Sequence, residues 1–579
     1  MMAMMNLQWR GGSLGLTLLV MTLALGACER DTSPAAETDT QAASPVPEEE
    51  TITEKEAPAE LLKPQDLGPE APAIYFTAGL DGYTEPCGCT ADILLGGIDR
   101  ITAFVDEAKK LHPQALMIDA GDWLFEHETI EAHMEPQERA KAAVLAAAHR
   151  KMGTRFSVPG PRDLALGVDV YREMMEAAGM TPLSANLTLK GQALQASDVA
   201  DLGDWTVAFV GLTQPALVDE IAGVEASDDA AALRRVLEGL DPEVDARVLV
   251  YQGSAERAEE LAAQAGVDFV IRGHNPEERV DAVALDADTY LLEAYDQGRY
   301  VGRLKLYGAG DEGAFVDARA ASSEARAALR TQMEHVEGNL RLLDVRTGGE
   351  ETPLRTRLSE RVQGLKDELS RLEREGFDVP EQGRAFIFEA VDMQPGYRLD
   401  DAIKKAREDY NANLAELNAK VEREVPPVEE GQAFYIGTAQ CATCHVEAHA
   451  FWEGTAHAGA VATLEERDKA FDQSCIGCHV VGWEQPGGSV LGKITYEAEL
   501  AGQTYTKDLN NVGCESCHGP GSNHRMQPLD ASGTPQHILR KPTAEACATC
   551  HVDEHSPRFD FDVYVRQITG EGHAYSDER

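Results

Sequence analysis

The chain has 579 residues, more than one hydrophobic core usually supports, so its length predicts two or more domains. Its 99 acidic residues outweigh 52 basic ones and give a formal net charge of −47 at pH 7. Such a surface repels nucleic acid and anionic lipid, which excludes both as partners of the folded part and favours a basic protein or a small molecule. A solvated acidic surface without a binding role explains the same charge, and composition leaves the two interpretations open.

The N-terminal 27 residues are predicted to be an export signal. Arg10 precedes an apolar run from Leu14 to Leu25, shorter than the roughly 20 residues that span a bilayer. Residues 25–28 (Leu-Gly-Ala-Cys) resemble the lipobox of bacterial lipoproteins, which implies cleavage before Cys28, lipidation of Cys28 and a membrane anchor. Glu29 favours the periplasmic side of the outer membrane, with the inner membrane left open. A secretory signal with an incidental cysteine is the simpler alternative.

Two segments of different composition follow. Residues 28–70 are rich in Glu, Pro, Ala, Ser and Thr and too poor in apolar residues to repay ordering, which predicts a disordered acidic tether. Residues 71–310 alternate short apolar runs with helical stretches, which predicts a layered α/β domain. The expected strands are residues 73–77, 115–119, 206–211, 248–251 and 269–271, and the expected helices include 98–111, 138–152 and 228–240.

Residues 311–428 are predicted to form a helical, coiled-coil-like connector, because apolar residues recur there at heptad spacing. One run covers residues 329–343 and a second covers 358–372, with two glycines between them, which predicts an antiparallel hairpin. A third helix is expected over residues 399–417. The apolar stripe either dimerises two chains or packs within one chain, and the shortness of each run favours packing within the chain.

The motif Cys-x-x-Cys-His occurs four times in residues 429–579. It attaches c-type haem, because the two thiols form thioethers with the porphyrin and the imidazole binds the iron. A structural zinc site also uses Cys-x-x-Cys but needs no histidine directly after each pair. We therefore predict a mostly helical and irregular domain with four haem c groups. The attachment residues are Cys441, Cys444, His445, Cys475, Cys478, His479, Cys514, Cys517, His518, Cys547, Cys550 and His551.

The second axial ligand of each iron decides what a haem can do. A second histidine gives a six-coordinate haem for electron transfer, whereas an open position lets the iron bind small ligands. The domain holds enough further histidines to ligate every iron twice, which favours electron transfer. These candidates are His449, His457, His524, His537, His555 and His573.

Three stretches of this domain resemble the tetrahaem cytochrome c family of hydroxylamine and nitrite metabolism. They are residues 452–458 (Trp-Glu-Gly-Thr-Ala-His-Ala), 514–524 and 547–559. The resemblance implies closely stacked haems that pass electrons from edge to edge, with His457, His524 and His555 as distal ligands and His573 as the next candidate. His449 and His537 lie outside these patterns. Some members of the family keep one five-coordinate haem, and the sequence does not say which iron, if any, is open here.

The α/β region resembles the 5'-nucleotidase-like metallophosphoesterases. The matching stretches, in the order of that family, are residues 75–89, 119–122 (Asp-Ala-Gly-Asp), 159–163, 184–187, 210–213 and 272–275. The resemblance implies two metal ions held by Asp, His and Asn side chains, which polarise phosphate and activate water.

Several of those ligands are replaced in this chain. Asp122 and His274 are kept, and Asp81 offers one more oxygen, but too few ligands remain for a normal dinuclear site. We therefore do not expect phosphoesterase activity. Gly79 and Asp81 stand where the family has Asp-x-His, and Gly160-Pro161-Arg162 stands where the family has Gly-Asn-His. Another histidine is expected near Tyr251-Gln252, and Pro276 replaces the second histidine of the motif Gly-His-x-His.

Cys87 and Cys89 remain after eight of the 11 cysteines are assigned to haem and Cys28 to lipid. They form either a redox-active or metal-binding pair, or a strained local disulfide or two inert thiols.

The sequence as a whole predicts a membrane-anchored periplasmic multihaem cytochrome that carries electrons between redox partner proteins. Three alternatives stay open. They are a haem oxidoreductase acting on a small nitrogen compound at one open haem, a phosphoesterase with a fused cytochrome, and a non-enzymatic scaffold for redox partners.

Overall fold

The computed structural model describes residues 62–64, 70–87, 95–276, 281–347, 353–375, 379–419, 423–532, 536–552, 556, 559–570 and 573. These residues belong to one compact unit, Glu54–Arg579. The predicted signal, Cys28 and most of the tether lie outside the described residues, as do Cys89, His555 and the side chain of Cys87.

The first sheet of the α/β domain has the strand order β17-β18-β16-β1-β4-β5-β6. Its centre is β1 (Ala73–Thr77), which pairs in parallel with β4 (Leu116–Asp119) and antiparallel with β16 (Tyr300–Tyr307). β5 (Phe156–Ser157) and β6 (Thr181–Pro182) continue the parallel side. Every residue of β1 is buried, as expected for a central strand that is covered on both faces.

The second sheet has the order β14-β15-β13-β12-β10-β9. β10 (Trp205–Thr213), β12 (Ala246–Gln252), β13 (Phe269–Arg272) and β15 (Tyr290–Leu292) run parallel to one another. The remaining strands are β9 (Ser197–Leu202), which pairs antiparallel with β10, and β14 (Val283–Ala284), which pairs antiparallel with β15.

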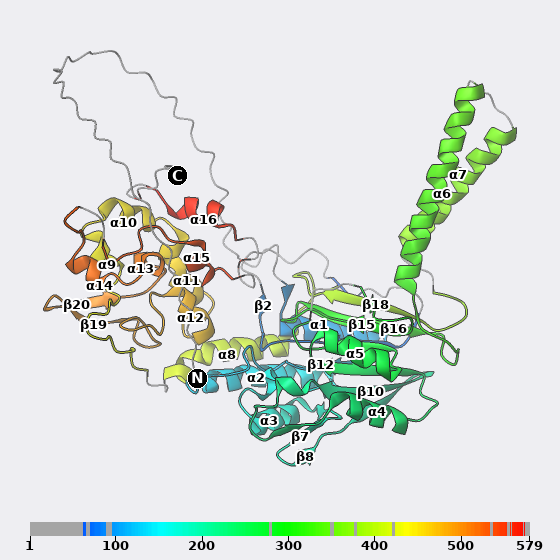
Figure 1. Cartoon of the computed structure of the whole chain (residues 1–579), viewed down its shortest axis with the longest axis horizontal. Helices are drawn as coiled ribbons and strands as arrows, with labels where there is room; N and C mark the ends of the chain where they lie inside the picture. Colours follow the sequence, from blue (N-terminus) through cyan, green and yellow to red (C-terminus); the bar gives the residue numbers. More distant parts are fainter. Residues whose placement is uncertain are drawn as a thin grey trace, which may run out of the picture. The chain divides into compact units, whose positions relative to one another are not determined.

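The two sheets pack face to face and are covered by helices on their outer sides (Figure 1). Because neighbouring side chains of a strand point to opposite faces, Ile74 and Phe76 of β1 join the core between the sheets while Tyr75 joins the core under the helices. The helices over the first sheet are α1 (Ile98–Leu111), α2 (Glu135–Met152), α3 (Val168–Ala178) and α8 (Asp401–Ala419), and those over the second are α4 (Asp229–Gly239) and α5 (Ala255–Ala265). The predicted layered α/β domain is therefore present.

Residues 311–428 are less purely helical than the heptad pattern predicts. β17 (Val316–Asp317) and β18 (Ala385–Asp392) lie in this segment and belong to the first sheet. β18 pairs with β16 along its full length, because its apolar run of Ala-Phe-Ile-Phe suits a buried strand. The expected third helix is α8, and its Ile403, Tyr410 and Leu414 enter the core of the α/β domain. Packing within the chain is thus correct for α8.

The predicted hairpin is present as α6 (Ala318–Thr347) and α7 (Pro353–Glu375), which lie side by side (Figure 1). Val362 and Leu365 of α7 are buried.

The C-terminal region consists of short helices and one β-hairpin, β19 (Thr495–Leu500) with β20 (Gln503–Asp508). Its apolar cluster is small and is centred on Leu464, Ile476, Val480 and Leu491. So small a core is expected where covalent haem supplies much of the apolar interior. Within the described part of the chain, no helix is both long and apolar enough to cross a bilayer.

Candidate functional site

Each Cys-x-x-Cys-His motif lies on or beside one short helix. The helices are α9 (Thr438–Ala442) with α10 (Val446–Trp452), α12 (Gln473–His479), α13 (Cys514–His518) and α15 (Ala544–Ala548). The His445 amide donates to the Cys441 carbonyl at 2.9 Å, and the His551 amide does the same to Cys547. A helical turn places residues three and four apart on one side, so both thiols and the imidazole can reach one porphyrin.

The four Cys-x-x-Cys-His motifs, numbered one to four in chain order, come together in space. The Cys441 and Cys514 thiols share a hydrogen bond, which raises the pKa of Cys441 and lowers that of Cys514. The Cys478 and Cys550 thiols share another, which lowers the pKa of Cys550 to about 6. In a mature c-type cytochrome these sulfur atoms are thioethers, so the free thiols stand in for the attachment points. Motif one therefore adjoins motif three, and motif two adjoins motif four.

Two pairs of histidine rings have the spacing that a shared iron requires. The ring centroids of His445 and His524 are 6.3 Å apart with 29° between their planes, and those of His457 and His551 are 6.2 Å apart. Metal–nitrogen bonds of about 2.0 Å place each bound imidazole centroid about 3 Å from the metal, hence about 6 Å from its opposite partner. Both pairs fit haem.

Hydrogen bonds fix the tautomer of several of these histidines. Nδ1 of His479 lies 2.6 Å from the Ala460 carbonyl oxygen, Nδ1 of His518 lies 2.7 Å from that of Leu539, and Nδ1 of His524 lies 2.9 Å from that of Gln536. A carbonyl oxygen only accepts, so each Nδ1 carries the proton. The lone pair then sits on Nε2, which is the state that binds a metal.

The surfaces beside the motifs are also suited to a porphyrin. Val446 follows His445 and is 66% exposed, and Leu539, whose carbonyl orients His518, is 43% exposed. Apolar surface of this kind beside these two predicted ligands is what a porphyrin ring would cover.

The remaining described histidines differ in their surroundings. Burial lowers the pKa of His573, and the charges of His518 and His445 lower it further, so His573 lies near two of the predicted proximal ligands. His449 packs on Trp452 and lies 3.7 Å from the Glu453 carboxylate. His537 is exposed.

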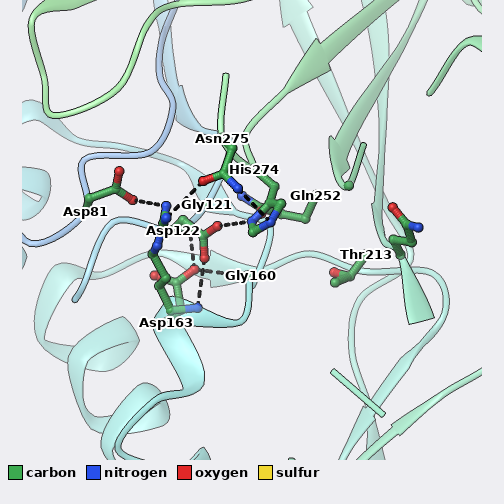
Figure 2. A network of polar contacts seen from close by, with 12 residues as sticks. Asp81, Gly121, Asp122, Gly160, Asp163, Thr213, Gln252, His274 and Asn275 are labelled. Atoms are coloured by element: carbon green, nitrogen blue, oxygen red, sulfur yellow. Dashed lines mark hydrogen bonds and ion pairs between the residues drawn. The ribbon is translucent and has the colours of Figure 1, made fainter. Parts of the chain in front are cut away.

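The α/β domain has a second polar site at the carboxyl ends of its parallel strands, where open α/β sheets usually bind ligands (Figure 2). Asp122 follows β4, Arg162 begins the short helix after β5, and His274 follows β13. Asp122 Oδ2 lies 2.7 Å from His274 Nδ1, so the two expected survivors of a metal site do meet. Asp81, Asp122 and Asn275 all have positive φ, a backbone strain that clusters at functional sites.

Arg162 connects the remaining groups of this site. Its guanidinium donates to Asp81 Oδ1 at 2.8 Å and to Asn275 Oδ1 at 2.9 Å, and its backbone amide donates to Asp122 Oδ1 at 3.0 Å. Burial raises the pKa of Asp81 well above its usual range, and the guanidinium opposes that rise. In the sequence, Arg162 stood out only because it replaces an expected ligand. Its ion pair with Asp81 was not predicted, because no local pattern connects two residues that are 81 positions apart in the chain.

The residues present do not fit a dinuclear metal centre. Gln252, near an expected histidine, donates its side-chain amide to the Ala120 carbonyl at 2.6 Å. The Arg162 guanidinium, which stands where a histidine is expected, is bonded to Asp81 and Asn275. Among the described residues, no three His, Cys, Asp or Glu side chains are grouped to hold a metal.

The C-terminal region is similar to c-type cytochromes, and the α/β domain is similar to 5'-nucleotidases. The family described as cytochrome c554 and c-prime matches residues 440–519, which contain three of the four motifs. Cytochrome c-554 of Nitrosomonas europaea is 33% identical over 152 residues, covering 21% of this chain and 60% of that protein. Human 5'-nucleotidase is 26% identical over 249 residues, covering 37% of this chain and 41% of that protein. The chain thus spans less than two thirds of either relative, and both predicted resemblances are confirmed.

Solved structures similar to this chain include a 5'-nucleotidase precursor from Thermus thermophilus, with a TM-score of 0.41 and 15% identity over 62% of this chain and 61% of that one. The sulfate thiohydrolase SoxB of the same organism has a TM-score of 0.36 and 16% identity over 42% of this chain and 55% of that one.

Proposed function

We propose that this protein is an exported electron carrier with four covalently attached haems, held at the periplasmic face of a membrane by lipid on Cys28. Its haem-binding, electron-transfer character follows from the family match, while the number of haems, the anchor and the path of electrons belong to the proposal. When bound, haem supplies one-electron exchange at its iron.

The carrying observation is the adjacency of the four motifs. Motif one adjoins motif three through Cys441 and Cys514, and motif two adjoins motif four through Cys478 and Cys550. Burial raises the pKa of Cys517 and the charges of Cys547 and Cys550 raise it further, so motif three also lies near motif four. These contacts support one continuous order of haems, one-three-four-two, along which electrons pass.

The chain's own residues favour transfer over substrate binding. His524 stands opposite His445 and His457 stands opposite His551, so each pair is placed to fill both axial positions of an iron. An iron ligated by two histidines changes charge without opening a site for a substrate. His555, predicted from the sequence, and His573, which lies near His518, are the remaining candidates for the second ligand of the other two irons.

The test is a haem count with a spin-state measurement on the full-length protein produced in a host that matures c-type cytochromes. We expect a mass increase of four haems per chain and an electron paramagnetic resonance spectrum dominated by low-spin iron. Replacing Cys514 and Cys517 by alanine should remove one haem. Fewer than four haems in the unaltered protein, or a spectrum dominated by high-spin iron, would contradict the proposal.

The same electron paramagnetic resonance spectrum distinguishes the proposed electron carrier from an enzyme whose haem converts a small nitrogen compound. Adding nitrite or hydroxylamine should leave a carrier unchanged, whereas an enzymatic haem would show a ligand-induced shift. Phosphoesterase activity is not proposed, because Arg162 and Gln252 occupy positions where ligands are needed.

A further inference from the structure

A buried network of charged and amide side chains connects the α/β domain to the second haem motif. Its haem-side members are Lys469, Asp472 and Gln473, which are buried and lie within six residues before Cys475. Asp472 caps helix α12 by accepting from the Ser474 amide, and its carbonyl accepts from the Cys475 amide at 3.1 Å. The first residues of the network are thus rigidly attached to the helix that carries Cys475, Cys478 and His479.

The α/β domain supplies the amide part of the network through α2 and α8. The side chain of Gln137 donates to Asp472 Oδ1 at 2.8 Å and accepts from the Gln473 amide at 3.1 Å. Asn418 donates to Gln137 at 2.9 Å and to the Phe471 carbonyl at 2.7 Å. Gln137 is fully buried, so these bonds replace all of its contact with water.

Charges alternate along the other branch. Lys469 Nζ lies 3.0 Å from Asp472 and 3.5 Å from Glu85. Glu85 also accepts from Arg407 at 3.2 Å, and Arg407 contacts Asp99 at 2.9 Å. Glu85, Arg407 and Asp99 all come from the α/β domain and α8. Lys469 is therefore the haem-side cation between one carboxylate of its own region and one of the other domain.

These charges act at the attachment point itself. The Cys475 sulfur is a thioether in the holoprotein, and its position beside the charges is fixed, because the Cys475 amide donates to the Asp472 carbonyl at 3.1 Å and the Asp472 carboxylate lies 3.0 Å from Lys469 Nζ. A field felt by that sulfur acts on the haem it holds, because buried charges are screened far less than exposed ones. Reduction of a haem adds one electron and thus one negative charge. A nearby ammonium therefore favours the reduced iron and a nearby carboxylate disfavours it.

We propose that Lys469, together with Glu85 across the domain boundary, sets the reduction potential of the haem at Cys475, Cys478 and His479. The α/β domain thereby supplies one of the two charges that adjust the reduction potential of this haem. The inference rests on the proposed function, since it requires a haem on the second motif. Lys469 and Glu85 do not contact the reacting iron and act through the field at its attachment site.

The test is a potentiometric titration of the full holoprotein, followed by visible absorbance, for two variants of opposite sign. Lys469→Met removes a cation and should lower the potential of one of the four haems. Glu85→Gln is isosteric, removes an anion from the other domain and should raise the potential of the same haem. Two surface changes serve as controls: Lys405→Met on α8, and Glu260→Gln on α5, where the carboxylate is 61% exposed. Neither control should move any of the four transitions.

Each outcome decides the proposal. Opposite shifts of one transition support it, whereas unchanged potentials, or shifts of equal sign in both variants, overturn it. If Lys469→Met fails to load four haems, Glu85→Gln decides alone: an upward shift of one haem supports the proposal, and no shift or a downward shift overturns it. If the unaltered protein itself lacks a haem at Cys475, the proposed function fails and not only this inference.

Discussion

The Arg162 guanidinium lies 2.8 Å from the Asp81 carboxylate, in a site whose other residues come from the ends of parallel strands. Asp81 is only 8% exposed and Arg162 19%, measured on their side chains. A fixed internal cation thus pairs with a buried carboxylate at the carboxyl ends of the parallel strands. Arg162 also donates its backbone amide to Asp122, which bonds to His274, so one residue connects both sides of the site.

Removal of that cation should destabilise the α/β domain. For Arg162→Met we expect a loss of about 3–5 kcal/mol in the free energy of unfolding, because Asp81 stays buried without its partner. Arg139→Met, which breaks the surface pair with Glu173, should cost at most about 1 kcal/mol. Chemical denaturation followed by tryptophan fluorescence measures both. Stabilisation of the unaltered protein by zinc or manganese ions, or its loss of stability with a chelator, would contradict a metal-free site.

Acid should destabilise the protein through His149. This ring is fully buried, packs edge-on against Trp123 and bonds to the Thr154 hydroxyl at 3.0 Å, and burial lowers its pKa from 6.5 to about 3. Between these values the unfolded chain binds a proton that the folded chain does not, so stability falls as pH decreases from about 6.5 towards 3. From pH 6.5 to 5 this loss amounts to about 2 kcal/mol. Urea unfolding at the two pH values should show it in the unaltered protein but not in His149→Gln. The exposed His127→Gln serves as the control and should behave like the unaltered protein.

Alkali should have the opposite effect at Lys507. Its ammonium is buried, donates to the Tyr435 and Gly487 carbonyls and lies 4.7 Å from the centroid of the Tyr496 ring, and burial lowers its pKa from 10.5 to about 8. The unfolded chain therefore holds the proton longer, and stability rises between pH 8 and 10 by about 2 kcal/mol. Lys507→Met should lack this rise, and Lys493→Met, at a half-exposed lysine, should keep it. Equal pH profiles for Lys507→Met and the unaltered protein would refute the assignment.

Loss of a distal histidine should change one haem only. For His524→Ala we expect one high-spin iron per chain, because the ring opposite His445 is removed while its haem stays attached through Cys441 and Cys444. Electron paramagnetic resonance and the visible spectrum measure the change. His537→Ala, at an exposed residue, should leave every haem low-spin. A high-spin signal in His537→Ala but not in His524→Ala would reverse the ligand assignment.

The net charge of −47 should govern the encounter with a redox partner. Reduction by a basic small cytochrome should slow as ionic strength rises from about 0.01 to 0.15 M, because the screening length shrinks from about 30 to 8 Å. Stopped-flow absorbance measures the rate. A rate independent of salt would show that the acidic surface does not steer binding.

Local patterns predicted much of this molecule. The haem motifs, the hairpin of α6 and α7 and the central strands follow from spacing and hydrophobic period, which are properties of short windows. β18 was missed because it lies between the second heptad run and the third expected helix and pairs with β16, a strand that precedes the whole hairpin in the chain. The Arg162–Asp81 pair and the bonds of Gln137 to Asp472 join distant residues through tertiary packing, for which a single sequence holds no local signal.

The hairpin of α6 and α7 is inserted between two neighbouring strands of the first sheet, so its two ends lie close together. β17 delivers the chain to α6 and β18 receives it after α7, and these strands are parallel neighbours with Val316 opposite Ala385. The two ends therefore stand about 5 Å apart, the distance between adjacent strands. A crossover of about a dozen residues, the minimum between parallel neighbours, could replace the whole hairpin without moving either strand. The hairpin can thus be shortened or removed by design while the sheet, and the haem region that packs on α2 and α8, keep their contacts.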